Sequence, residues 1–99
     1  MSKAAAKSWI KSALKNLYKC EGQSGKVAQE GIIRLSLLWL SDAMMRMPAP
    51  SDNSMYNTAG AALVGAVDDL GGALTATGKQ RERYLNSAAR LMEEAIAEL

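Results

Sequence analysis

The chain contains no histidine and no phenylalanine, and only one of its 99 residues is a cysteine. Without histidine it lacks the side chain that most often serves as a general base or as a metal ligand. The single Cys20 builds neither a disulfide framework nor a zinc finger, and it is consistent with a reducing compartment. We therefore expect a protein that is not an enzyme, holds no metal or other cofactor, and has no small-molecule substrate.

Long hydrophobic runs are also missing. The longest strongly apolar segment, residues 32–40, is interrupted by Arg34 and falls well short of the roughly 20 residues that a membrane-spanning helix needs. Residues 1–6 lack the apolar core of a signal peptide. These two absences predict a soluble cytoplasmic protein with no membrane partner.

Alanine and leucine dominate the apolar part of the composition. The chain has 17 alanines and 12 leucines, whereas valine and isoleucine together number 7. Alanine and leucine are among the best helix formers, and the β-branched residues that favour strands are scarce. With 48% apolar residues and a net charge of only +2, the chain does not have the composition of a disordered protein. The composition therefore predicts an all-α fold.

Glycine and proline divide the chain into four helical segments. The breaks are a glycine-rich turn after Glu21, a linker with Pro48 and Pro50, and a turn at Gly78. Connections this short favour antiparallel neighbours, which predicts one domain folded as a compact four-helix bundle. The expected helices span residues 2–21, 25–47, 53–74 and 78–99 of a single helical domain, 1–99.

The starts of three of these helices carry residues that suit a helix N-cap. Ser24 precedes the second helix, a Ser/Asp/Asn cluster at 51–54 precedes the third, and Thr77 with Gln80 has the spacing of a capping box. We expect these side chains to accept hydrogen bonds from the first backbone amides of their helices.

The second segment is apolar around most of its circumference. At about 100° per residue, the polar Glu30, Arg34 and Ser41 cluster in a narrow arc, and further apolar residues such as Leu38 lie beyond that arc. Glu30 and Arg34 also have the spacing of a helical ion pair. This helix is therefore either the central helix of an irregular monomer, with the pair as an interior polar lock, or it supplies a second, intermolecular face.

The third segment leads to the same alternatives, because residues 53–67 carry no charge. Gly60 and Gly65 weaken the helix unless something approaches it closely, and small residues permit such an approach by another backbone. The ordinary interpretation is the interior of a compact monomer. The other is a homodimer with two-fold symmetry, formed through the second and third helices.

Methionines gather around the proline linker, where flexible thioethers suit either an adaptable binding surface or irregular gaps at the end of a helix. Of these, Met45 and Met47 are the candidates for exposure. The candidate apolar docking or dimer contacts are Leu37, Met45, Met47, Ala61, Val64 and Gly65.

A lysine recurs every fourth residue along the first helix. The stripe belongs to a basic half: residues 1–50 hold 8 basic and 3 acidic groups, net +5, and residues 51–99 hold 4 and 7, net −3. Such a surface could bind phosphates or an acidic protein, or it could be an ordinary solvated face. The stripe consists of Lys3, Lys7, Lys11, Lys15 and Lys19.

Residues 62–85 offer a possible helix-turn-helix, with Lys79, Arg81 and Arg83 on the recognition helix. The fit is poor, because the glycines do not fall at the turn and Glu82 on the same helix would oppose DNA. Sequence-specific DNA binding is therefore disfavoured.

These observations favour a small non-catalytic protein-interaction module, a regulatory, inhibitory or adaptor factor that binds and masks a partner protein. In size and helical character the chain resembles small accessory proteins of phages and mobile elements, although no motif supports that resemblance. The alternative is a non-specific nucleic-acid binder that uses the lysine stripe. A third hypothesis is an enzyme with a carboxylate site at Asp68 and Asp69, which no other carboxylate cluster supports.

Overall fold

The computed structural model of this chain describes residues 3–23, 25–47 and 54–99, except for the side chains of 54–57. These residues form four α-helices and no strand, which confirms the all-α four-helix bundle. One short 3₁₀ helix, η1, follows the first α-helix. The elements are α1 (Lys3–Leu17), η1 (Tyr18–Gly22), α2 (Lys26–Arg46), α3 (Ser54–Thr75) and α4 (Gly78–Glu98).

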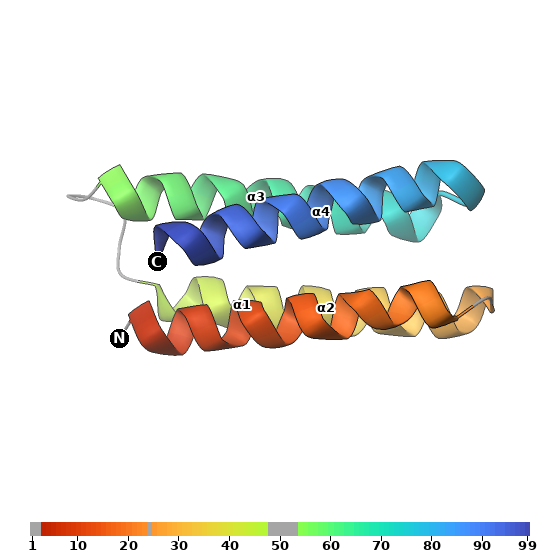
Figure 1. The fold of residues 1–99 in the computed structure, drawn as a ribbon, viewed down its shortest axis with the longest axis horizontal. Coiled ribbons are helices and arrows are strands. Elements are labelled where there is room, and N and C mark those ends of the chain that lie inside the picture. Colours follow the sequence, from red (N-terminus) through yellow and green to blue (C-terminus); the bar gives the residue numbers. More distant parts are fainter. Residues whose placement is uncertain (1–2, 24, 48–53) are drawn as a thin grey trace.

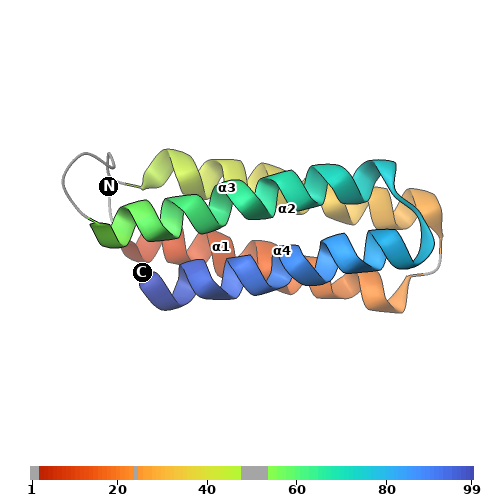
Figure 2. The ribbon, with the colours of Figure 1, turned by 90° about the horizontal axis from the view of Figure 1, so that it is seen from above.

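The four helices form two antiparallel hairpins that stack on each other (Figures 1 and 2). Helix α1 packs mainly against α2, and α3 packs mainly against α4. Across the stack α1 faces α4 and α2 faces α3, so each helix has two neighbours and one outward side. The result is an elongated molecule of 42 × 19 × 18 Å, in which the start of α1 and the end of α4 lie at the same end.

The helix ends differ in detail from the sequence prediction. The first helix was expected to reach residue 21, but its α-helical part ends at Leu17 and the chain continues as the 3₁₀ helix η1. Helix α2 ends at Arg46, and Met47 is extended, as expected of a residue that precedes a proline.

The predicted capping box at the start of α4 is wrong. Thr77 is the N-cap residue, but its side chain makes no capping hydrogen bond. The turn into α4 depends instead on Gly78, whose φ of +58° lies in the left-handed region that glycine adopts without strain. The N-cap of α2 is Gly25, while the predicted caps at 24 and 51–53 lie outside the described residues.

The core is built largely from alanine and leucine, which lets the helices pack closely. Its large, fully buried side chains come from all four helices, and small alanines fill the space between them. The fully buried large residues are Ile10, Ile33, Leu40, Leu63, Leu70 and Met92.

Two buried polar residues lock α1 to α2. The Nδ2 of Asn16 donates to the backbone oxygen of Ile32 and to the Oγ of Ser36, both at 3.0 Å, and Ser36 Oγ donates to the backbone oxygen of Ala13 at 3.0 Å. Because each buried group has a partner, the network can fix the relative position of the two helices without an unpaired polar atom.

Candidate functional site

Helix α2 has one side that no other described element covers. Figure 2 shows α2 along one edge of the bundle, with α1 and α3 on its inner sides. The residues on its uncovered side follow each other at alternating steps of four and three, so they line up along the helix. This outer face of α2 consists of Val27, Gly31, Arg34, Leu38, Ser41 and Met45, all of which are exposed.

The outer face of α2 exposes large apolar side chains to an unusual degree. Val27 is 84% exposed, Leu38 59% and Met45 73%. Complete burial of one such side chain lowers the free energy by about 1.5–3 kcal/mol relative to leaving it in water. A single exposed leucine needs no explanation, but three large exposed apolar side chains on one side of a helix make that side a candidate binding surface. The alternative of a fully interior second helix is therefore wrong, because α2 presents an uncovered apolar face.

Two ion pairs within α2 lie on and beside this face, and Arg34 of the face belongs to one of them. Arg34 lies 3.9 Å from Glu30, and Arg46 lies 3.9 Å from Asp42. The guanidinium of Arg46 also sits 5.0 Å from the centroid of the Trp9 ring, which holds it toward α1. The predicted Glu30–Arg34 pair is thus confirmed, although with Arg34 in solvent. Of the six residues that make up the face, only Arg34 is charged, and its partner Glu30 also pairs with Arg81.

The candidate docking residues separate into exposed and packed ones. Met45 is exposed, and on the neighbouring α3 so are Ala61 and Val64, the latter by 50%. Leu37 and Met47 are half-buried and pack against the core. One residue along the helix makes the difference: Leu38, next to Leu37, carries the exposed side chain.

Two of the small residues of α3 accommodate α4 of the same chain. A Cβ atom at Gly65 would lie 3.0 Å from a methyl group of Leu91, and one at Gly72 would lie 2.7 Å from the Tyr84 ring. The sequence pattern predicted a close approach by another backbone at Gly60 and Gly65. Of these two glycines, a close approach occurs at Gly65 only, and the approaching group is a side chain within the bundle. Gly65 therefore has a packing role inside the chain, whereas Gly60 faces open space.

The lysine stripe lies along one side of α1 and continues onto η1. Lys11, Lys15 and Lys19 are exposed, and Lys3 and Lys7 are half-buried. Three salt bridges join described residues, and none of them involves the four lysines from residue 7 to residue 19. An acidic group of α4 lies nearby, because the Tyr18 hydroxyl donates to Glu93 Oε1 at 2.7 Å.

Arg81 is a buried charged residue that sequence reasoning did not single out as structural. The sequence pointed to it only in the disfavoured helix-turn-helix interpretation, beside Lys79 and Arg83, and the structure buries it, with only 5% of its surface exposed. Its Nε donates to the backbone oxygen of Ala73 at 2.9 Å and its Nη1 to Gln29 Oε1 at 3.1 Å. A residue buried in this way cannot contact a nucleic acid.

Glu30 faces the remaining nitrogen of Arg81, with Oε2 at 3.5 Å from Nη2. This ion pair joins α2 to α4, and it is the long-range partner that the i,i+4 spacing did not reveal. The sequence does contain a pattern that indicates the burial of Arg81. It lies seven residues before the buried Ala88, which places both residues on the same side of α4.

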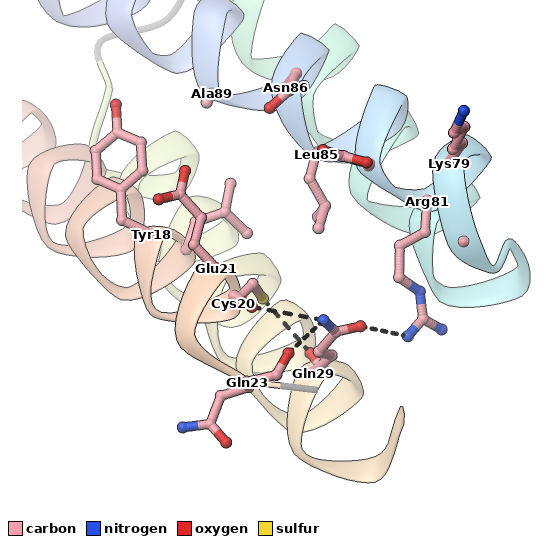
Figure 3. Close-up of a pocket in the computed structure, with 13 residues that line it drawn as sticks. Tyr18, Cys20, Glu21, Gln23, Gln29, Lys79, Arg81, Leu85, Asn86 and Ala89 are labelled. Atoms are coloured by element: carbon pink, nitrogen blue, oxygen red, sulfur yellow. Dashed lines mark hydrogen bonds between the residues drawn. The ribbon is translucent and has the colours of Figure 1, made fainter. Parts of the chain in front are cut away.

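A cavity of about 570 Å³ lies between η1 and the first half of α4 (Figure 3). Its walls bear two cations, Lys79 and Arg81, and two carboxylates, Glu21 and Glu82. The walls therefore carry no net charge that would select an ion, and Arg81 is already paired.

The only thiol of the chain also lines this cavity. Burial raises the pKa of Cys20, and the nearby Arg81 offsets that rise only in part. A thiol with a raised pKa is a weak nucleophile at neutral pH. The cavity therefore offers no evident chemistry, and Cys20 behaves as a small core residue.

Comparison with protein-family models, with curated proteins and with solved structures gives no match for this chain. Within the described residues, no helix is both long and apolar enough to cross a membrane. Over the same residues, no three metal-ligating side chains of the His/Cys/Asp/Glu type come together. Asp68 and Asp69 accordingly have no third carboxylate beside them. Of the surfaces described, the outer face of α2 is the strongest candidate for function.

Proposed function

We propose that this chain is a small protein-interaction module that docks a partner protein against the outer face of α2, and so regulates, inhibits or recruits that partner. The observation that carries the proposal is the row of exposed apolar side chains at Val27, Leu38 and Met45. A docked helix would bury this row of apolar side chains, and the removal of that surface from water favours association.

The chemistry of the face favours a protein over a nucleic acid. Its centre is apolar, and the flanking Arg34 and Arg46 are each matched by a carboxylate within the same helix. Nucleic-acid surfaces carry an excess of basic residues along the contact, because phosphate neutralisation supplies most of the affinity. A partner helix with apolar side chains at similar spacing fits this face better.

Site-specific photo-crosslinking tests the proposal. A benzophenone amino acid is placed at Leu38 and, as the matched control, at the exposed Glu94 on α4. In the cells that produce the chain, the Leu38 probe should give a discrete adduct with a protein, and the Glu94 probe should give none at that mass. Equal diffuse labelling from both probes, or no adduct from Leu38, would contradict the proposal.

The lysine stripe supports a second candidate, non-specific binding of nucleic acid. Lys11, Lys15 and Lys19 are exposed and unbridged by carboxylates within the described residues. Titration with a labelled single strand at about 50 mM salt separates the two candidates. Binding that weakens steeply with salt and disappears in the triple variant Lys7→Glu, Lys11→Glu, Lys15→Glu would favour the nucleic-acid candidate. No binding at that salt concentration would remove it.

A further inference from the structure

We propose that the occupant of the outer face of α2 is a second copy of this chain, packed antiparallel against the first with Leu38 of each copy at the centre. This inference rests on the proposed function, because it uses the same face, and it names the partner. It is carried by a self-complementary arrangement of shape and charge along α2.

The first element of complementarity is a bulky residue and a gap at equal distances from Leu38. Met45 lies seven residues after Leu38 and is 73% exposed. Gly31 lies seven residues before it, and a Cβ atom there would meet nothing within 4 Å. Both are about 10 Å from Leu38 along the helix axis. Turning one copy end for end about Leu38 therefore brings Met45 of each copy over Gly31 of the other.

The second element is charge. Arg34 lies four residues before Leu38 and Asp42 lies four residues after it, on either side of the apolar row. The same end-for-end turn brings Asp42 of the second copy to the level of Arg34, on both sides of the two-fold axis. The side chain of Arg34 is 66% exposed, and both its contact with Glu30 and the contact of Asp42 with Arg46 are long, at 3.9 Å. Arg34 and Asp42 can therefore also contact each other across the two copies.

A parallel arrangement loses both features. It would set Arg34 at the level of Arg34 and Asp42 at the level of Asp42, which places like charges together across the contact. It would also oppose Gly31 to Gly31 and Met45 to Met45. The pattern on α2 is therefore specific to the antiparallel pairing, and an isologous two-fold contact is the usual form of a homodimer.

Sedimentation of the full chain between about 1 and 100 µM tests the association, since a contact made mainly by one helix belongs to the small, weaker class of interface. Wild type should approach twice the mass of one chain as its concentration rises. Leu38→Glu should remain a monomer, with its circular dichroism showing an intact fold. The matched control Val64→Glu, which alters an exposed apolar residue of α3, should dimerise as wild type does. A wild-type chain that stays monomeric throughout would overturn the inference.

Disulfide trapping tests the antiparallel register. In a Cys20→Ala background, Gly31→Cys and Met45→Cys are made as separate proteins and oxidised alone and as a mixture. The mixture should give a crosslinked dimer, while Gly31→Cys alone should give at least tenfold less. Efficient crosslinking of Gly31→Cys to itself would overturn the antiparallel arrangement.

The two proposals can fail separately. A discrete photo-adduct from Leu38 at a mass other than two chains, together with a monomeric chain in sedimentation, would overturn the second copy and leave the interaction module standing. No adduct from Leu38 together with a monomeric chain would overturn both.

Discussion

Arg81 shows how one side chain can join parts of the bundle that the sequence keeps apart. It lies on the first turn of α4, contacts the backbone of Ala73 on α3, and reaches Gln29 and Glu30 on α2. Three elements therefore meet at one guanidinium. Breaking a buried pair of this kind is costly, because the group that remains keeps its desolvation penalty without a partner.

Replacing Arg81 should destabilise the chain far more than replacing an exposed arginine. We expect Arg81→Ala to lower the free energy of unfolding by about 2–4 kcal/mol, since it leaves Glu30 and the Ala73 carbonyl without this donor. Urea unfolding followed by tryptophan fluorescence measures the change. The control Arg90→Ala, at an exposed position of α4, should change it by less than about 0.5 kcal/mol. Similar losses for both variants would contradict the structural role of Arg81.

At the scale of one element, the adjacent glycines of α3 have different reasons to be small. Gly71 is exposed, and a Cβ atom there would meet nothing within 4 Å. Gly72 faces α4, where the Tyr84 ring already occupies the space that a Cβ atom would take. Gly71 therefore only weakens the helix, whereas Gly72 permits the close contact between α3 and α4.

Alanine at these two positions should therefore act in opposite directions. We expect Gly71→Ala to raise the free energy of unfolding by about 0.5–1 kcal/mol, because alanine is the better helix former. Gly72→Ala should lower it by about 1 kcal/mol, because the ring must move out of a packed interface. In a Tyr84→Ala background, Gly72→Ala should become stabilising, and thermal or urea unfolding of the four proteins completes the cycle. The same sign for both glycines in the wild-type background would show that Tyr84 does not limit this site.

For the whole molecule, two titratable groups link stability to alkaline pH. Burial raises the pKa of Cys20, and the hydrogen bond to Glu93 is the main cause of the raised pKa of Tyr18. The folded chain therefore holds both protons more tightly than the unfolded chain does. The stabilisation that these groups provide is complete below the pKa values of the unfolded chain and is lost as pH rises through the higher values of the folded one.

We accordingly expect stability to decrease as the pH is raised above about 9, where thiols and phenols begin to ionise. Urea unfolding at a series of pH values gives the slope. The variant Cys20→Ala, Tyr18→Phe should show a shallower decrease than wild type over the same range, because neither group can then release a proton. Identical slopes for the two proteins would mean that these groups titrate alike in the folded and unfolded chain.

The fold was largely accessible from the sequence, because helix formation depends on local terms. Abundant Ala and Leu, the breaks at glycine and proline, and the apolar periodicity of each segment predicted four helices and their approximate ends. The start of α4 was predicted less well, because two local features can each set such a turn: a capping side chain and a left-handed glycine. Thr77 did not form its predicted cap, since the left-handed Gly78 sets the turn into α4.

The candidate site was only partly accessible. The surplus of apolar residues on the second helix indicated an extra face, and Met45 was correctly placed on it. Sequence reasoning selected Leu37 where Leu38 is the exposed residue, since the rotation of a helix that is apolar on nearly all sides is poorly determined by its own pattern. The packing of α1 and α3 against α2 fixes that rotation.

The sequence by itself determined the all-α class of this protein and its division into four helices. Those conclusions follow from composition and local preference, which act before any tertiary contact forms. Only the tertiary structure decided which apolar residues face water, that Arg81 is interior, and that Gly65 serves the chain's own packing. The physical reason is that burial depends on neighbours distant in sequence, and a helix cannot specify which of its sides they will cover.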